Sequence, residues 1–198
     1  MKSQWINPRL VHSEKTMSWQ AKIVNLSMRL SKWYLSGKDF ASAKAAMIKM
    51  SDGPAAKAAH PDGAIVAREV IDGVNCEWVH DKSVPEECRQ VIVYFHGGGF
   101  FFGSPATHRD VAHRLSAASK MKTLVVDYRL TPEHAFPAAL NDAAAVYQWL
   151  LANGYQADDI AFGGDSAGGN MTIATMKLLQ QSNTELPFAG FCISAWAD

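Results

Sequence analysis

The 198-residue sequence is poor in cysteine, has no excess of charge of either sign and contains no long apolar run. Its cysteines, Cys76, Cys88 and Cys192, are odd in number and lack Cys-x-x-Cys spacing, which argues against a disulfide framework and against a zinc site. Basic and acidic residues number 19 each, so no basic field predicts nucleic acid or an anionic membrane as a partner. No secretory segment follows Met1. We therefore expect a cytoplasmic protein that holds no metal and no cofactor.

The first 50 or so residues differ in pattern from the rest. An apolar stripe of helical spacing runs through Trp19, Ile23, Leu26, Leu30 and Trp33. A second helical stretch covers 40–50 and is expected to end near Asp52-Gly53-Pro54. The stripe fits two helices packed on a core, a cap over a pocket, or an interfacial helix with a basic polar face.

From residue 64 onward, short strands alternate with helices. Two partly alternating segments, 65–71 and 74–79, flank Asp72-Gly73, which is a hairpin signal. Apolar runs predict further strands at 91–95, 123–127, 160–164 and 187–194. Helical patterns cover 105–119, 138–152 and 170–181. This alternation predicts an α/β fold with a mostly parallel sheet flanked by helices and an antiparallel pair at its edge.

One short motif stands where a strand turns into a helix. Gly164-Asp165-Ser166-Ala167-Gly168 is a Gly-x-Ser-x-Gly sequence between an apolar run and a helical pattern. This is the outline of a nucleophile elbow, in which the serine oxygen is held at the tip of a strained turn. The motif alone also fits an ordinary glycine-rich turn, so its context has to decide.

A glycine run supplies that context, because it follows the strand at 91–95. Gly97, Gly98 and Gly99 lack side chains, so their N–H groups can point at a substrate oxygen. The N–H of Ala167, at the start of a helix, can donate to the same oxygen, and such donors stabilise the oxyanion of acyl transfer. A phosphate-binding loop is the alternative, but Gly-Lys-Ser/Thr and Gly-x-Gly-x-x-Gly are both missing.

Three motifs in order carry a family resemblance over residues 60–198. They are His96-Gly97-Gly98-Gly99-Phe100, then Asp127-Tyr128-Arg129-Leu130 with Pro132-Glu133-His134, then Gly164-Asp165-Ser166-Ala167-Gly168-Gly169. The chain resembles the hormone-sensitive-lipase-like esterases, bacterial family IV of the α/β-hydrolases. The resemblance implies an α/β-hydrolase fold with an N-terminal helical cap, here 1–55, ahead of a core that begins at 56. It also implies hydrolysis of short or medium acyl esters.

The resemblance also assigns roles to individual residues. Ser166 would be the nucleophile, and Gly97, Gly98, Gly99 and Ala167 would form the oxyanion hole. His96 and Asp165 would support the site, and Arg129, Glu133 and His134 would hold the neighbouring loop. His108 and His113, on a predicted helix, are expected to be ordinary surface or packing residues.

The catalytic acid and base of this family are missing from the sequence. In α/β-hydrolases the triad runs serine, acid, histidine along the chain, yet all seven histidines precede Ser166 and the only later acids are Glu185 and Asp198. We therefore expect 56–198 to be the N-terminal portion of a longer hydrolase core, C-terminally incomplete, with its last strand as a bare apolar edge. Alone, such a chain should hydrolyse esters poorly.

The expected partner is a small-molecule ester, without nucleic acid or stable membrane insertion. A homodimer or association with a complementary C-terminal fragment is also expected. The alternative is a catalytically dead or ligand-binding α/β-hydrolase-like protein, similar to the plant gibberellin receptors.

Overall fold

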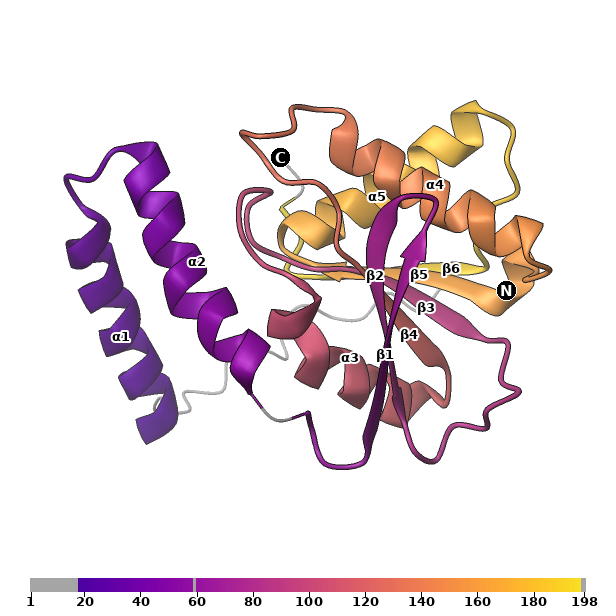
Figure 1. Cartoon of the computed structure of the whole chain (residues 1–198), viewed down its shortest axis with the longest axis horizontal. Coiled ribbons are helices and arrows are strands. Elements are labelled where there is room, and N and C mark those ends of the chain that lie inside the picture. The colour runs from indigo at the N-terminus through magenta and orange to yellow at the C-terminus, as the bar shows by residue number, and fades with distance from the viewer. Residues whose placement is uncertain (1–17, 59, 197–198) are drawn as a thin grey trace, which may run out of the picture. The chain divides into compact units, whose positions relative to one another are not determined.

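The structure is a computed structural model that describes residues 18–58 and 60–196 (Figure 1). The chain forms two compact units, residues 1–43 and 44–198. The boundary at 55/56 that we expect between a cap and a core stays a prediction. None of the helices in the described ranges is long and apolar enough to cross a membrane.

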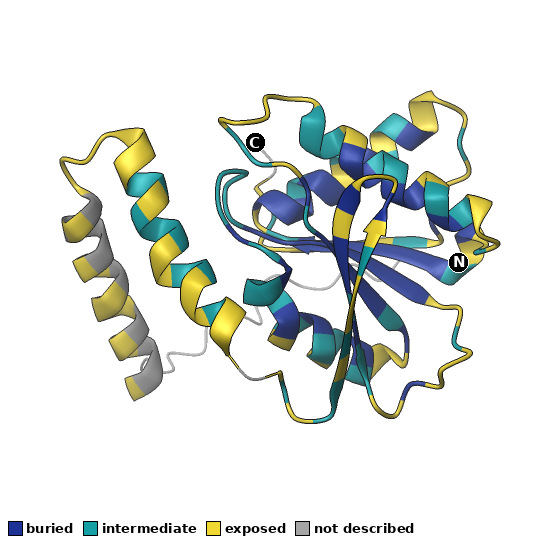
Figure 2. Ribbon diagram, in the orientation of Figure 1, coloured by how far each residue is buried: buried dark blue, intermediate teal, exposed yellow. Residues whose placement is uncertain are grey.

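Helix α1 (Trp19–Leu35) forms where the apolar stripe predicts it. The side chains of Trp19, Ile23, Leu26 and Leu30 are each more than half exposed, and Figure 2 colours the described residues of α1 as exposed. The side chain of Trp33, the last member of the stripe, lies outside the described part of the structure. The four described members of the stripe are therefore exposed to solvent.

Helix α2 (Phe40–Lys57) continues past the point where we expect it to stop, so that prediction is wrong. Pro54 lies inside the helix. A proline removes one N–H donor, and its ring normally crowds the β-carbon of the preceding residue. That residue is Gly53, which has no β-carbon, so part of the usual steric penalty is absent.

A six-stranded mixed sheet forms the centre of the second unit, with strand order β1-β2-β4-β3-β5-β6. Strands β3, β4, β5 and β6 are parallel, while β1 and β2 are antiparallel at one edge. The strand bounds are Ala64–Ile71, Val74–Asp81, Val91–Phe95, Lys122–Val126, Ile160–Asp165 and Ala189–Ile193. The expected α/β fold with a mostly parallel sheet is thus confirmed.

Helices cover both faces of the sheet (Figure 1). Helix α3 (Pro105–Ser119) contacts β2 and β4, whereas α5 (Ala167–Gln181) contacts β3, β5 and β6 and packs against α4 (Ala138–Ala152). Alternate side chains of β3 pack on opposite faces of the sheet. One face, with α4 and α5, takes Val91, Val93 and Phe95. The other, with α3, takes Ile92 and Tyr94. This period of two follows from strand geometry.

Two short segments show how local sequence sets the boundaries. Asp72 and Gly73 have φ of 48° and 80° in a two-residue hairpin between β1 and β2, which confirms the predicted hairpin. Helix α5 starts at Ala167, three residues before the predicted start, so this boundary is corrected. Gly168 and Gly169 are buried in its first turn, where close packing outweighs the low helix propensity of glycine.

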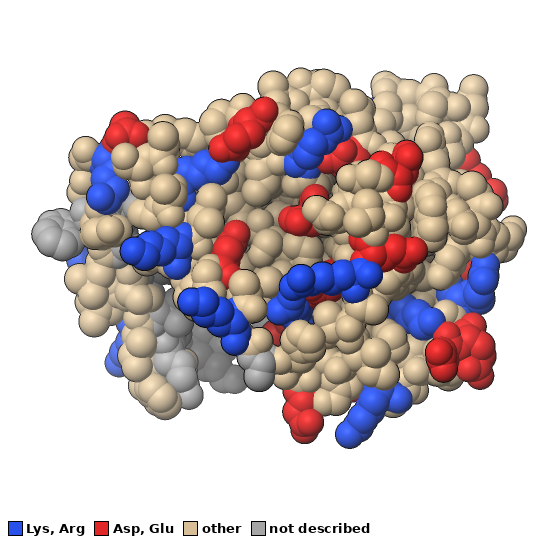
Figure 3. All heavy atoms as spheres, in the orientation of Figure 1, with Lys and Arg blue, Asp and Glu red and all other residues tan. Residues whose placement is uncertain are grey.

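The surface carries charges of both signs. On the face drawn in Figure 3, lysine and arginine side chains are interspersed with aspartate and glutamate, in agreement with the balanced composition. The 3-10 turn Ala157–Asp159 leads into β5, and β6 lies at the edge of the sheet opposite β1.

Candidate active site

Ser166 lies at the sharp turn between β5 and α5. Its backbone has φ 52° and ψ −116°, an unusual conformation for a residue with a β-carbon, and its side chain is exposed. The Ser166 N–H donates to the carbonyl of Ile193 at 2.9 Å, which fixes the turn to the end of β6. Its hydroxyl makes no hydrogen bond to any residue that the structure describes. The oxygen is therefore presented to solvent, without an intramolecular partner among these residues.

The glycines two residues on either side of Ser166 allow backbone segments to touch. A β-carbon at Gly168 would lie 1.8 Å from the carbonyl oxygen of Phe95, and one at Gly164 would lie 2.3 Å from the carbonyl oxygen of Gly168. Both distances are far inside van der Waals contact. The elbow thus requires glycine at these positions, and α5 begins directly against the end of β3.

The glycine loop leaves β3 at His96 and folds back on itself. Gly98 and Gly99 have positive φ, 129° and 60°, and the Gly98 carbonyl accepts hydrogen bonds from the N–H groups of Phe101 and Phe102, both at 3.1 Å. A β-carbon at Gly98 would lie 1.9 Å from the carbonyl oxygen of Phe102. Position 98 therefore accommodates only glycine.

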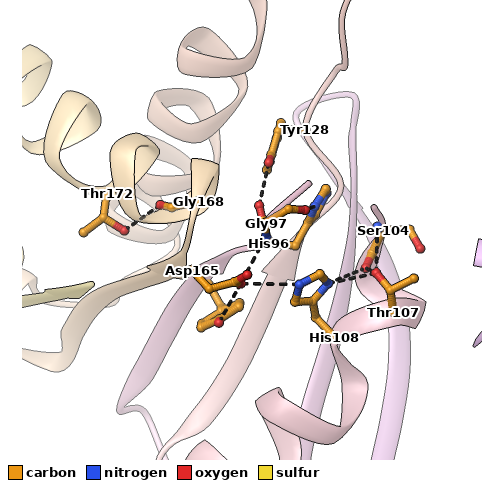
Figure 4. A network of polar contacts seen from close by, with 10 residues as sticks. His96, Gly97, Ser104, Thr107, His108, Tyr128, Asp165, Gly168 and Thr172 are labelled. Atoms are coloured by element: carbon orange, nitrogen blue, oxygen red, sulfur yellow. Dashed lines mark hydrogen bonds and ion pairs between the residues drawn. The ribbon is translucent and has the colours of Figure 1, made fainter. Parts of the chain in front are cut away.

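The loop and the elbow lie side by side (Figure 4). The Gly97 N–H donates to Oδ1 of Asp165 at 3.1 Å, and a β-carbon at Gly97 would be 3.1 Å from the Asp165 carbonyl oxygen. This N–H is therefore engaged. By contrast, the N–H groups of Gly98, Gly99 and Ala167 make no hydrogen bond within the described residues.

His96 is completely buried beneath the loop. Its ring stacks on Tyr128 with centroids 4.4 Å apart, and its Nδ1 lies 2.8 Å from the carbonyl oxygen of Gly97. The Tyr128 hydroxyl donates to the His96 carbonyl at 2.6 Å. Burial lowers the pKa of His96 to about 4, so the imidazole is neutral at pH 7. The ring packs under the loop and makes no contact with Ser166.

The Asp165 carboxylate contacts β3, the glycine loop and α3. Its Oδ1 accepts hydrogen bonds from the Tyr94 hydroxyl at 2.9 Å and from Gly97, and His108 Nε2 lies 3.4 Å away. Burial acts to raise the pKa of Asp165, but the hydrogen bond and charge of His108 and the other two donors outweigh it and lower the pKa. The carboxylate is therefore an ionised acceptor that joins the elbow to the loop.

His108 and Tyr94 are site residues that sequence reasoning missed. The expectation that His108 is an ordinary surface or packing residue does not describe its contact with Asp165. The available signal was position, because His108 sits in the first turn of the helix that follows the glycine loop. His113, on the same helix, contacts Asp81 at 2.9 Å on β2, away from the glycine loop.

The loop after β4 is anchored from two sides. The Arg129 guanidinium donates to Asp142 at 2.7 Å, and its backbone N–H donates to the same carboxylate at 2.9 Å. The Lys44 ammonium contacts the Glu133 carboxylate and donates to the Thr131 carbonyl at 2.7 Å. These contacts fix the loop backbone at 129–133.

A pocket of about 360 Å³ lies next to the elbow. Its walls come from the glycine loop, the loop after β4, the starts of α4 and α5 and the segment after β6; among them are Gly99, Phe100, His134, Asn170, Met171 and Trp196. The lining is mostly apolar, with Asn170 held by its hydrogen bond to the Trp196 carbonyl at 2.9 Å. The pocket suits a small apolar group near the start of α5.

A base for Ser166 is missing from this arrangement. Of the histidines that the structure describes, none hydrogen bonds to Ser166. Glu185 is exposed beyond the end of α5, and Asp198 lies outside the described residues. Within the described ranges no group of three or more histidine, cysteine, aspartate or glutamate residues could hold a metal ion.

Comparison with known proteins places this geometry in a family. Residues 92–198 match a family described as having the alpha/beta hydrolase fold, and the chain belongs to that family. Its homologues are esterases of the hormone-sensitive lipase type. An acetyl-hydrolase from Streptomyces hygroscopicus is 36% identical over 138 residues, which are 70% of this chain and 44% of that protein.

Two further comparisons agree. The carboxylesterase/phospholipase LipF of Mycobacterium tuberculosis is 41% identical over 105 residues, which are 53% of this chain and 28% of that protein. A crystal structure of an esterase from the bacterial hormone-sensitive lipase family superposes with a TM-score of 0.78 at 32% identity, covering 92% of this chain and 60% of that one. The chain thus spans less than half the length of these curated relatives.

Proposed function

We propose that this chain carries the nucleophile and oxyanion hole of a serine carboxylic ester hydrolase. The observation that carries the proposal is an exposed Ser166, on a turn with positive φ, next to a glycine loop in which the N–H groups of Gly98 and Gly99 make no hydrogen bond within the described residues. In the proposed reaction the Ser166 oxygen attacks the ester carbonyl carbon and the alcohol leaves with a proton. The resulting acyl-enzyme is then cleaved by water.

The proposed oxyanion hole consists of the N–H groups of Gly98, Gly99 and Ala167. Gly97, the fourth candidate, already donates to Asp165, which supports a hole of three donors instead of four. Removing one such donor in known enzymes costs about 10²–10³ in rate. The conformation of the loop should therefore have a large effect on the rate.

The general base and its acid are proposed to come from outside this copy of the chain. A complementary C-terminal fragment or a second copy of the chain could supply them. Names of relatives such as acetyl-hydrolase and carboxylesterase, together with the small pocket at the start of α5, support short or medium acyl esters as substrates. The cytoplasmic location and the cap role of residues 1–55 stay predictions.

Acylation by an activated ester tests the proposal. The chain is incubated with p-nitrophenyl butyrate, and intact mass and peptide mapping follow the butyryl adduct. We expect slow acylation at Ser166, because oxyanion hole and binding alone retain about 10³–10⁴-fold catalysis over water. Ser166→Ala should abolish the adduct, and Ser194→Ala, a matched serine substitution, should leave it. Equal acylation of wild type and Ser166→Ala would contradict the proposal.

A ligand-binding protein is the second candidate, and one observation favours it: no described histidine contacts Ser166. In that case esters and their hydrolysis products would bind beside Ser166 without forming an adduct. Titration calorimetry with butyrate and with a non-hydrolysable butyl ketone, beside the acylation assay, separates binding from chemistry.

A further inference from the structure

The Asp165 carboxylate joins three elements through one oxygen atom, as Figure 4 shows. Oδ1 accepts the Tyr94 hydroxyl of β3 and the Gly97 N–H of the glycine loop, and His108 Nε2 of α3 lies 3.4 Å from it. A carboxylate oxygen accepts and cannot donate when ionised. A donor role for His108 in this contact therefore requires a proton on Nε2, the ring nitrogen that faces the carboxylate.

The His108 ring is held in this direction from its other side. Its Nδ1 lies 2.8 Å from the Thr107 hydroxyl oxygen and 3.3 Å from the Ser104 carbonyl oxygen. The ring also lies against His96, with centroids 5.5 Å apart, and against Tyr94 at 6.3 Å. The imidazole is thus fixed at both nitrogens and on its face, as a group that only fills space would not be.

His108 and Gly97 stand at opposite ends of one segment. Gly97 begins the glycine loop, and His108 lies in the first turn of α3, directly after that loop. Both contact the same carboxylate. Between them, Gly98 and Gly99 have the weakest intrinsic conformational preference of any residue type. The direction of their N–H groups therefore depends both on the hydrogen bonds within the loop and on how its two ends are anchored.

We propose that His108 is a positioning residue, which orients Asp165 and through it the Gly97 end of the glycine loop, and so aims the N–H groups of the oxyanion hole. This role rests on the proposed function only in one respect, namely that the glycine loop forms an oxyanion hole. The charged and titratable groups that face His108 are Asp165 of β5, Tyr94 of β3 and the neutral His96. Loss of the His108 donor should raise the pKa of Asp165, because that hydrogen bond and charge contribute to lowering it.

Two substitutions separate the donor from the ring. His108→Phe keeps a ring against His96 and removes the donor, whereas His108→Gln keeps a donor. His113→Phe is the matched control, since His113 lies on the same helix and pairs with Asp81 at 2.9 Å, away from the loop. Amide hydrogen exchange at Gly97, measured by NMR on the full chain, reports how firmly the Gly97 N–H is bonded to Asp165. Carbon-13 NMR of the Asp165 carboxyl reports its titration.

We expect Gly97 to exchange about tenfold faster in His108→Phe, the size of one lost hydrogen bond. The Asp165 carboxyl should titrate at higher pH in that variant. His113→Phe should change neither reading, and His108→Gln should restore the Gly97 exchange rate. Equal Gly97 exchange in His108→Phe and His113→Phe would overturn the positioning role.

The remaining outcomes are also decisive. If His108→Phe does not fold, His108→Gln is compared with His108→Asn, whose shorter side chain does not reach Asp165, and equal Gly97 exchange in that pair overturns the proposal. Neither readout needs substrate or the Ser166 hydroxyl. A chain that fails to acylate therefore counts against the proposed function alone.

Discussion

Two tight turns of this protein share one backbone feature and differ in their surroundings. Ser166 at the elbow has φ 52°, and Asp72 at the β1–β2 hairpin has φ 48°. At the elbow a β-carbon on Gly168 would lie 1.8 Å from backbone, whereas one on Gly73 would meet nothing within 4 Å. The backbone around the elbow glycines is crowded, whereas the hairpin is open.

The comparison separates two reasons for a constrained turn. The hairpin holds its shape through its own dihedral angles, as two-residue loops do. The elbow is held by its neighbours: the Ser166 carbonyl accepts hydrogen bonds from the N–H groups of Asn170 at 3.2 Å and Trp196 at 3.0 Å. Strain at Ser166 is thus maintained by tertiary contacts, and changes there should cost more than changes at the hairpin.

Gly168→Ala should have the largest effect. The new methyl would overlap the Phe95 carbonyl oxygen, and both backbone segments are buried and cannot move aside. We expect a loss of about 3 kcal/mol or more in the free energy of unfolding, at or above the upper end of overpacking. Urea denaturation followed by circular dichroism measures it. A loss as small as that of Gly73→Ala would remove the distinction between the two turns.

Ser166→Gly should have the next largest effect, and it should stabilise. Relief of the strained backbone is worth about 1–3 kcal/mol, and the added freedom of glycine in the unfolded chain takes back about 0.5–1 kcal/mol. A net gain near 1 kcal/mol is expected in the same denaturation experiment. Ser166→Ala, which keeps the β-carbon, is the control and should leave stability nearly unchanged. A destabilised glycine variant would mean that the turn is not strained.

Gly73→Ala should cost about 1 kcal/mol, because alanine is disfavoured at φ 80° but meets no neighbouring atom. Gly73→Asn should cost less, since asparagine tolerates the left-handed region. Thermal unfolding of the pair provides the measurement. Equal losses in both variants would point to an unseen steric contact at the hairpin.

Asp165→Asn should give the smallest change, and one that depends on pH. The pKa of Asp165 is lowered in the folded state, so its ionised form stabilises the protein above its ordinary value of 3.8. That contribution is lost as the pH falls through the lowered folded value. Urea denaturation at pH 7 and pH 3 should show the variant weaker at pH 7 and the difference reduced at pH 3. A difference independent of pH would exclude this explanation.

Local patterns predicted much of the fold. The buried strand 91–95 and the hairpin at Asp72-Gly73 depend on neighbours in sequence, and both are present as expected. Gly168 in the first turn of α5 was not predicted as helical, because what holds it there is the distant backbone of Phe95. Contacts between distant segments decide such positions.

In the candidate site, too, some features depend on local sequence and others on contacts between distant segments. The motif around Ser166 and the glycines of the loop are visible in the sequence as residue types at fixed spacing. The engagement of the Gly97 N–H and the contact between His108 and Asp165 are not, since each joins residues far apart in the chain. These two contacts, drawn in Figure 4, hold the motif against the glycine loop and α3.

The last strand of the sheet bears on how the protein behaves in concentrated solution. Strand β6 pairs with β5 and lies at the sheet edge; the side chains of Ile193 within it, and of Phe188 and Trp196 beyond its two ends, are exposed. A free edge with apolar side chains is a template for strand addition. Self-association through β6 should therefore set the upper concentration at which single molecules can be studied.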